Sequence, residues 1–451
     1  MEKKENIREL VTDMVTEIVA GREKSHILIR NVLDKYAYLP GYDRNFIKKV
    51  TEGTLERLIT IDYVINSFSK VPVNKMKPFI RSLMRMSVYQ ILYLDKVPDS
   101  AACNEAVKLA QKRGFGPLKG FVNGVLRNIA RNKETIVYPD REKDLVKSLS
   151  VKYSMPQHLV ELLLTQYGET DAEAIFAGYH LERPVCVRMS QNLSAQEKEQ
   201  VLHNWDTLGT EAKPHPWLAY AYELHQAGNL KEDVNFTNGL YTVQDVSSML
   251  VSEIAGIREG DYIIDVCSAP GGKALHACDK LHGTGCVDAR DVSDYKTGLI
   301  LENKERLHAD NLCVKVWDAR VKDAEAEGKA DIVLLDIPCS GLGVIGRKPE
   351  IKYRLDEASF AQLDALQKEI ADAVVCYVKP GGTLIYSTCT LRKEENEQMV
   401  TYIAEKYGFT TDSLNPYLPK ELQDEDTVKG YLTLLPTDKS DGFFMARLIK
   451  L

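Results

Sequence analysis

Apolar residues recur at helical spacing through the first third of the chain. The segment from Ile7 to Val19 carries one at every third or fourth position, which places a single helix face on a core. The same spacing predicts further helices, and a Gly/Pro-containing break at residues 114–117 precedes the last of them. We therefore expect residues 1–135 to form an all-α bundle, with helices over 7–19, 27–36, 44–58, 62–68, 78–94, 103–113 and 121–131.

Residues 136–235 mix helical stretches with short alternating strands. Helices are predicted over 156–167 and 171–180, and a third follows Ser194, a residue type that favours the N-cap position. Alternation of apolar and polar residues predicts strands at 184–189, 211–215 and 219–224. This part of the chain is expected to be a small α+β subdomain.

From about residue 236 the pattern changes to strands alternating with helices, which is typical of a parallel sheet with helices on both faces. A stretch of about 200 residues is the size of a single domain. We therefore predict an α/β fold with a Rossmann-like, doubly wound sheet over residues 236–451. Its strands are expected at 262–266, 285–289, 313–316, 332–335, 383–386 and 442–448.

Net charge and cysteine content limit the partners and the cellular compartment that can be expected for the protein. The net charge is −7, yet residues 1–135 carry roughly 24 basic and about 15 acidic side chains, a balance compatible with RNA. Nine cysteines without a CxxC pair or an HExxH motif argue against a disulfide framework and a zinc site. Neither an apolar signal core nor a membrane-length apolar run is present. We expect a cytoplasmic monomer without membrane or metal partners.

A glycine-containing turn follows the first strand of the predicted sheet. It reads Cys267-Ser268-Ala269-Pro270-Gly271-Gly272-Lys273, and glycines at such a strand-to-helix turn let a ligand approach the backbone. The turn lacks the G-x-G-x-x-G of dinucleotide sites and the full P-loop pattern. A cofactor without phosphate, such as S-adenosyl-L-methionine, suits it best.

Three aspartates are candidates for holding that cofactor. Asp291 follows the turn at nearly the interval of the ribose-binding carboxylate in Rossmann-type folds. Asp288 competes for this role, and either residue could instead be a plain helix N-cap. Asp318 ends the third strand, where a carboxylate could accept a hydrogen bond from the adenine amino group.

Two cysteines and an aspartate follow two other core strands. Cys389 comes after the strand at 383–386, and Asp336 and Cys339 come after the strand at 332–335. A single free cysteine is usually a small buried residue, but three such groups at the ligand-binding edge of a sheet indicate a site. A thiolate can add to carbon-6 of cytosine and activate carbon-5 for methylation, while a carboxyl group assists at ring nitrogen 3.

Two family resemblances follow from longer motifs. Residues 1–135 resemble the NusB family of RNA-binding antitermination factors. The C-terminal motifs resemble the RNA cytosine-5-methyltransferases of the NOL/NOP/Sun class, and together with the NusB-like part they match its bacterial Sun-type members, which act on 16S ribosomal RNA. The matching stretches are Arg81–Leu94, Asn104–Ala110, Phe121–Arg127, Ala269–Lys273, Asp336–Val344, Arg347–Tyr353, Ser387–Cys389 and Glu394–Asn396.

The resemblance implies a role for each candidate residue. Cys389 would be the nucleophile, Cys339 would help release the methylated product, and Asp336 would hold the cytosine edge. The cofactor pocket would comprise Cys267 to Lys273 with Asp291, Asp318 and Asp336, and 16S ribosomal RNA would be the partner. Thr390 departs from the family pattern, because serine is common after the nucleophile.

Three other interpretations stay open at this point. By analogy with DNA cytosine-5-methyltransferases, which also place Pro-Cys after a strand, Cys339 would attack and Cys389 would be a core residue. A ribosome-assembly factor with an inactive enzyme domain is a second possibility. Methylation of an amino group is a third, although it would call for Asn-Pro-Pro-Tyr or Asp-Pro-Pro-Tyr where Ile337-Pro338-Cys339 stands.

Overall fold

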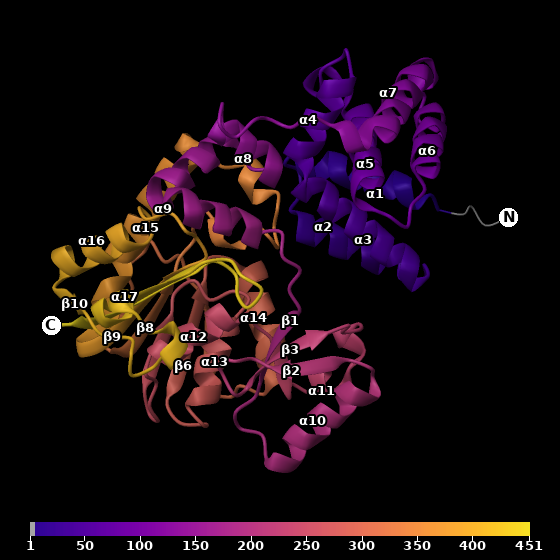
Figure 1. Ribbon diagram of the computed structural model, residues 1–451. Coiled ribbons are helices and arrows are strands. Elements are labelled where there is room, and N and C mark those ends of the chain that lie inside the picture. The colour runs from indigo at the N-terminus through magenta and orange to yellow at the C-terminus, as the bar shows by residue number, and fades with distance from the viewer. Residues whose placement is uncertain (1–4) are drawn as a thin grey trace. The chain divides into compact units, whose positions relative to one another are not determined.

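A computed structural model describes residues 5–451 of the chain (Figure 1). Two units can be distinguished by their internal packing, and each is described separately. The first comprises Met1–Ala177 together with Ile345–Leu355, and the second comprises Gly178–Val344 together with Asp356–Leu451. Within the described residues, no helix is both long enough and apolar enough to cross a membrane.

Between residues 5 and 178 the regular elements are all helical, as the apolar spacing predicts for residues 1–135. The predicted helix starts at residues 62 and 103 lie too far along the chain, because α4 begins directly after a one-residue break at Arg57 and α6 begins directly after Pro98. The helices are α1 (Ile7–Val19), α2 (Ser25–Lys35), α3 (Gly41–Glu56), α4 (Leu58–Phe68), α5 (Pro78–Tyr93), α6 (Asp99–Lys112), α7 (Lys119–Asn132), α8 (Leu145–Tyr153) and α9 (Gln157–Gly178).

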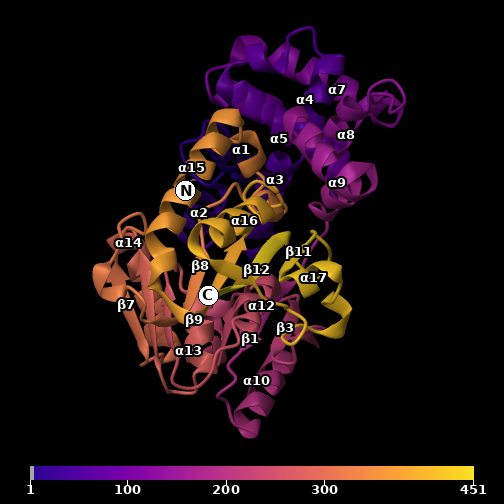
Figure 2. The same cartoon turned by 90° about the vertical axis from the view of Figure 1, so that its left-hand side faces the viewer.

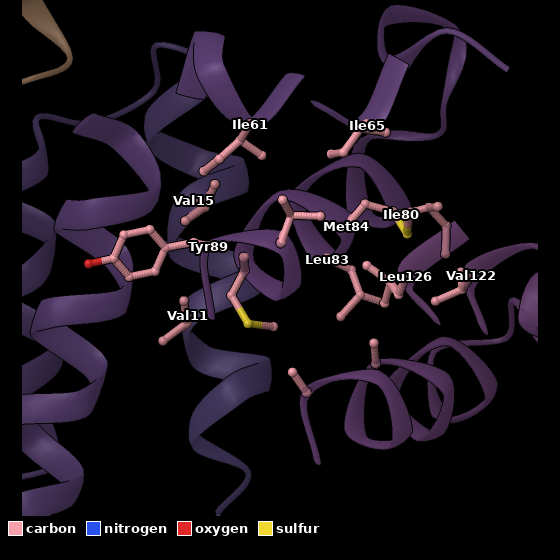
Figure 3. Packing of buried hydrophobic residues seen from close by; sticks show 14 of the residues in the cluster. Val11, Val15, Ile61, Ile65, Ile80, Leu83, Met84, Tyr89, Val122 and Leu126 are labelled. Carbon is pink, nitrogen blue, oxygen red and sulfur yellow. The ribbon is translucent and has the colours of Figure 1, made fainter. Parts of the chain in front are cut away.

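Helix α5 forms the centre of this bundle. It packs against α1, α3, α4, α6 and α7, and its residues are buried on most of its circumference. The buried guanidinium of Arg85 is paired with Asp62 at 2.6 Å. Figure 3 shows its Leu83 and Met84 among side chains of the surrounding helices, including Val11 and Leu126. The Tyr89 ring occupies the space where a side chain at Gly53 would lie, with ring atoms 2.1 Å from an ideal Cβ position.

Two features of α8 and α9 refine the sequence prediction. Helix α8, capped by the Asp144 side chain, lies where no element was predicted. Helix α9 is interrupted at Gly168, whose φ of 75° and ψ of 176° are not helical. It is therefore two helical segments in succession, which agrees with the predicted pair over 156–167 and 171–180.

A small antiparallel sheet with two helices follows α9. Its strands are ordered β2-β3-β1-β4, and helix α10 begins after Ser194, whose capping box with Glu197 confirms the predicted N-cap. The strands are β1 (Val185–Met189), β2 (Glu211–Pro214), β3 (Ala221–His225) and β4 (Tyr241–Val243), with helices α10 (Ala195–Thr207) and α11 (Val234–Thr237).

The large sheet has the order β10-β12-β9-β8-β5-β6-β7, with β11 paired to β12. Strands β5 to β9 run parallel and β12 is antiparallel to β9. The strands are β5 (Tyr262–Asp265), β6 (Cys286–Asp291), β7 (Leu312–Val316), β8 (Ala330–Asp336), β9 (Val378–Thr388), β10 (Phe409–Thr411), β11 (Tyr431–Leu434) and β12 (Phe443–Lys450). The predicted Rossmann-like sheet is confirmed.

Helices cover both faces of this sheet, because its core strands are apolar on both sides. Along β8, Ile332 and Leu334 pack with α12, α13 and α14, whereas Val333 and Leu335 pack with α15 and α16. Figure 1 shows α15 and α16 together beside β8 and β9, and Figure 2 gives the view turned by 90°. The helices are α12 (Val246–Ile254), α13 (Gly272–Lys280), α14 (Asp294–Leu307), α15 (Glu357–Val374), α16 (Glu397–Tyr407) and α17 (Glu425–Lys429).

Candidate active site

The strand order reverses between β5 and β8, so a crevice opens at their carboxyl ends. Asp336 ends β8 at this point and is half-buried. Its Oδ2 accepts a 2.7 Å hydrogen bond from Lys273 Nζ, and its Oδ1 accepts one of 2.8 Å from Ser387 Oγ. Burial alone would lower the pKa of Lys273, but the carboxylate of Asp336 outweighs it and the net shift is upward. The pair is therefore a partly buried ion pair with a defined orientation.

The two candidate cysteines meet next to this ion pair. Cys339 follows β8 and Cys389 follows the neighbouring parallel strand β9, in which Ser387 lies opposite Asp336. Their sulfur atoms are 3.3 Å apart. The hydrogen bond to Cys389, together with burial, raises the pKa of the Cys339 thiol well above its ordinary value. Cys339 therefore stays protonated and can donate a hydrogen bond to the Cys389 sulfur.

Glu395 ties the two cysteine-bearing loops together. Its side chain is fully buried, and its Oε2 accepts hydrogen bonds from the Ser340 backbone nitrogen at 2.8 Å and from Gln367 Nε2 at 2.9 Å. The Gln367 amide also donates to the Pro338 carbonyl at 3.0 Å. Burial raises the pKa of Glu395, while these donors partly oppose the shift. One acidic side chain thus fixes the loop after β8 from a position after β9.

Asn396 holds the backbone on both sides of Cys389. Its Oδ1 accepts a 2.6 Å hydrogen bond from Thr388 Oγ1, and its Nδ2 donates to the Thr390 carbonyl at 3.1 Å. The Thr390 hydroxyl in turn lies 2.6 Å from Ser340 Oγ. Threonine at 390 therefore provides the hydroxyl that a serine would supply. These supporting roles were not assigned from the sequence, although Glu394-Glu395-Asn396 was noted as a motif.

The backbone at Gly343 lies close to that of Cys389 and Gly442 and connects these segments by hydrogen bonds. The Gly343 nitrogen donates a 2.9 Å hydrogen bond to the Cys389 carbonyl, and the Gly442 nitrogen donates one of 3.0 Å to the Gly343 carbonyl. A Cβ atom at Gly343 would lie 1.9 Å from the Gly442 oxygen. Only glycine fits this position, because the obstructing atoms are backbone.

The predicted cofactor turn lies between β5 and α13. Gly271 adopts a φ of 99°, in the left-handed region that favours glycine, and α13 begins at the next residue. Burial, followed by the negative charges nearby, raises the pKa of the Cys267 thiol, so this half-buried cysteine stays protonated. The turn presents the backbone of Ser268, Ala269 and Pro270 together with the start of a helix at the sheet edge.

The structure brings Asp291 to this turn and holds Asp288 elsewhere. Asp291 ends β6, is buried, and its Oδ2 accepts a 2.9 Å hydrogen bond from the Ala269 nitrogen. Asp288 lies earlier in the same strand, where its carboxylate accepts two hydrogen bonds from Arg290. Asp288 therefore belongs to a buried ion pair, and Asp291 is the carboxylate that faces the predicted cofactor site.

Asp318 follows β7 at the same edge, two strands away from β5. Arg320 binds both of its carboxylate oxygens at 2.6 to 3.1 Å. Hydrogen bonds from Arg320 hold the pKa of Asp318 below its ordinary value. The group is thus a charged, half-exposed acceptor whose partner arginine is also exposed.

Unpaired buried groups show that this site fits a cationic cofactor. Both carboxylate oxygens of Asp265, at the end of β5, are buried without a well-aligned hydrogen bond from residues 5–451, and so is the nearby Ser268 hydroxyl. Ser268 lowers the pKa of Asp265 by less than burial raises it. Burial and then the charge of Asp336 raise the pKa of Asp265 to about 7. Such orphaned acceptors are rare unless a ligand satisfies them. No cluster of residues in the described part of the chain could hold a metal ion.

Comparisons with known proteins agree with this geometry. The sequence model of the family described as 16S rRNA methyltransferase RsmB/F matches residues 254–449, and that of the NusB family matches residues 5–131. A probable ribosomal RNA small subunit methyltransferase B of Bacillus subtilis is 33% identical, with 99% of both chains covered. The chain belongs to the RsmB family of ribosomal RNA small subunit methyltransferases. The methyl donor of this family is S-adenosyl-L-methionine.

More distant relatives extend the comparison. The Synechocystis relative with the same description is 30% identical over 98% of this chain and 99% of its own. Among solved structures, PH0851 gives a TM-score of 0.81 at 23% identity over 98% of this chain and 99% of its own. NSun6 from Pyrococcus horikoshii gives a TM-score of 0.56 at 21% identity over 65% of this chain and 98% of its own. At these identities the two structures support the fold alone.

Proposed function

We propose that the chain methylates carbon-5 of a cytosine in 16S ribosomal RNA through a transient bond between Cys389 and the pyrimidine ring. The observation that carries this proposal is the 3.3 Å approach of the Cys339 and Cys389 sulfurs beside Asp336. A methyltransferase that acts on a nucleophilic nitrogen needs no thiol at this place. Carbon-5 of cytosine is a poor nucleophile and requires prior addition at carbon-6.

Cys389 performs the addition. Its sulfur lone pair forms a bond to carbon-6, and the electron pair of the carbon-5–carbon-6 double bond moves to carbon-5, where it is delocalised toward ring nitrogen 3. Bound S-adenosylmethionine supplies an electrophilic methyl group to this electron pair. The Cys339 thiol supports the step because it can donate a hydrogen bond to the Cys389 sulfur, 3.3 Å away.

Asp336 and Lys273 orient the base. Each Asp336 oxygen already accepts one hydrogen bond, and a carboxylate oxygen can accept a second one. The exocyclic amino group of cytosine, or a protonated ring nitrogen 3, can therefore bind there. The Lys273 ammonium group fixes the carboxylate and stabilises it as a charged acceptor.

Release reverses the addition. Loss of the carbon-5 proton to water or another base restores the double bond, and the carbon-6–sulfur bond breaks as Cys389 leaves with its electron pair. The Cys339 thiol lies at hydrogen-bonding distance from this sulfur and can donate a hydrogen bond to the departing thiolate. Cys339 is accordingly proposed to act in product release.

Bisulfite sequencing tests the proposed position of methylation. Purified protein is incubated with 16S ribosomal RNA lacking the modification and with S-adenosylmethionine, and the RNA is then treated with bisulfite. We expect one cytosine to resist deamination in the complete reaction and none without the cofactor. Methyl incorporation without a resistant cytosine would contradict methylation at carbon-5.

A further inference from the structure

The stretch after the Cys339 loop belongs by its packing to the helical unit. Residues Ile345–Leu355 group with Met1–Ala177, although they lie between β8 and α15 in the methyltransferase sequence. Three of their charged side chains, Glu350, Lys352 and Arg354, bind ends of helices in that unit. The stretch Ile345–Leu355 is called the anchor segment below.

Glu350 completes the N-terminus of α2. Its carboxylate is buried and accepts hydrogen bonds from the Ser25 nitrogen at 3.0 Å and from Ser25 Oγ at 2.6 Å. Helix α2 starts at Ser25, and the side chain of its own N-cap residue, Lys24, makes no capping hydrogen bond. A helix N-terminus has unsatisfied N–H groups and a partial positive charge, so a carboxylate from elsewhere is a favourable cap.

Lys352 and Tyr353 bind the C-terminus of α3. The Lys352 ammonium donates a 2.8 Å hydrogen bond to the Glu56 carbonyl, and the Tyr353 hydroxyl donates one of 2.7 Å to the Leu55 carbonyl. Lys352 is only 1% exposed. Burial lowers its pKa to about 7, so this lysine has been desolvated to reach the carbonyl. A weak surface contact would not require that cost.

Arg354 binds the chain that leaves α1. Its Nη2 donates a hydrogen bond of 2.8 Å to the Glu23 carbonyl and a longer one of 3.4 Å to the carbonyl of Ile18, in the last turn of α1. Glu350 thus binds the N-terminus of α2, whereas Lys352 and Arg354 bind carbonyl groups at the C-terminal ends of α3 and α1. This pattern of charges is the favourable one with respect to the helix dipoles.

The residues immediately before the anchor segment hold the catalytic cysteines. The Gly343 nitrogen donates to the Cys389 carbonyl, and the Ser340 nitrogen donates to Glu395. One continuous stretch of chain, from Asp336 to Leu355, therefore carries catalytic contacts at its beginning and helix-end contacts at its end. A loop that is fixed at both ends samples fewer conformations than one fixed at a single end.

We propose that the helical unit positions the catalytic loop through the anchor segment, with Glu350, Lys352 and Arg354 as positioning residues for Cys339. The inference rests on the proposed function, and it adds that the contacts of the anchor segment restrain the loop that carries Cys339. Loss of the helix-end contacts is expected to slow the reaction of bound RNA more than it weakens RNA binding, because small misplacements of reacting groups are costly.

The first test loosens the anchor in the full-length protein. We expect Glu350→Gln and Arg354→Met to lower kcat about tenfold or more, with the KM for 16S ribosomal RNA within about twofold of wild type. Arg113→Met is the matched control, because Arg113 binds Glu9 and Asp13 in the same unit without touching the anchor segment. Its kcat should equal that of wild type.

A second variant separates positioning from stability. Two glycines inserted between Arg347 and Lys348, both exposed, keep the helix-end contacts but slacken their link to the catalytic loop. Two glycines inserted after Gly328, in an exposed turn, are the control. We expect only the first insertion to lower kcat, with thermal unfolding unchanged in both. A folded first-insertion variant with wild-type kcat would overturn the inference.

Thiol reactivity gives a readout that needs no RNA. Iodoacetamide labelling followed by mass spectrometry compares half-buried Cys339 with exposed Cys313 in the same molecule. Loosening the anchor should raise the labelling rate of Cys339 relative to Cys313 by about threefold or more, as expected for local opening. Unchanged labelling in folded variants would count against the inference. Absence of 5-methylcytosine with the wild-type protein would instead contradict the proposed function, and the labelling test would still apply.

Discussion

The backbone nitrogen of Ser340 donates a 2.8 Å hydrogen bond to the buried carboxylate of Glu395. This bond connects the loop after β8, which carries Cys339, to the loop after β9, which carries Cys389. Parallel pairing of β8 and β9 brings the two loops to one edge of the sheet, where the sulfur atoms of the two cysteines are 3.3 Å apart. The contact between Ser340 and Glu395 holds the two loops together at this point. Catalytic geometry on loops depends on such supporting contacts.

Removing the Glu395 carboxylate should therefore affect both folding and catalysis. Glu395→Ala leaves the buried Ser340 nitrogen and one N–H group of the Gln367 amide without an acceptor, which should lower the free energy of unfolding by ~2 kcal/mol. Methylation should fall about tenfold or more because the cysteines are no longer held in position. Urea unfolding and single-turnover methylation measure the two effects.

The neighbouring glutamate supplies the control. Glu394 is about one-third exposed and pairs with Arg392 at 3.3 Å, so Glu394→Ala should change the stability by less than ~1 kcal/mol. Equal losses in the two variants would show that Glu395 has no special supporting role.

The two cysteines should behave differently when each is replaced. Cys389→Ala should lower methylation on the order of 10³-fold or more, because no thiol remains to add to the ring. Cys339→Ala should still form the bond to RNA but release it slowly, which leaves an RNA–protein adduct on a denaturing gel. An adduct in the Cys389→Ala protein, and none in Cys339→Ala, would reverse the roles.

Cofactor binding should depend on pH through Asp265, whose pKa is raised to about 7. S-adenosylmethionine carries positive charge, so it binds better to the carboxylate than to the protonated acid. Its affinity should rise about tenfold between pH 6 and pH 8 and release protons near neutrality. Calorimetry in buffers of different ionisation enthalpy measures both, and Asp265→Asn should remove the dependence.

Ionisation of Asp265 should also make the free energy of unfolding depend on pH in the protein without cofactor. The folded state retains a proton on Asp265 that the unfolded state loses, so the free energy of unfolding should fall as the pH rises from about 4 to about 7. Unfolding of Asp265→Asn should lack this contribution. A wild-type protein that gains stability over this range relative to the variant would contradict the assigned shift.

Two glycines should respond to alanine in opposite directions. Gly343→Ala places a Cβ 1.9 Å from the Gly442 oxygen and should destabilise the protein by about 1–3 kcal/mol while displacing the Cys389 loop. Gly124 lies exposed within α7 with no atom near its Cβ position, so Gly124→Ala should stabilise by about 0.5–1 kcal/mol. Thermal unfolding compares the two variants.

The sequence alone determined the architecture and the chemical groups of the site. Apolar spacing distinguishes helices from strands, and alternation of the two predicts a parallel sheet whose strands end at one edge. Asp336, Cys339 and Cys389 could be placed at that edge because each lies within four residues of the end of a predicted strand. Their chemistry was then read from residue type and from resemblance to a known family.

Tertiary structure decided which groups meet. Asp288 and Asp291 lie on the same short strand, and only the packing shows that Arg290 binds the former while the turn at Ala269 binds the latter. The sequence also did not predict the contact of Glu395 with Ser340 or the grouping of the anchor segment with the helical unit. Periodicity reports which face of an element is buried, whereas contacts between loops distant in sequence depend on how the whole chain packs.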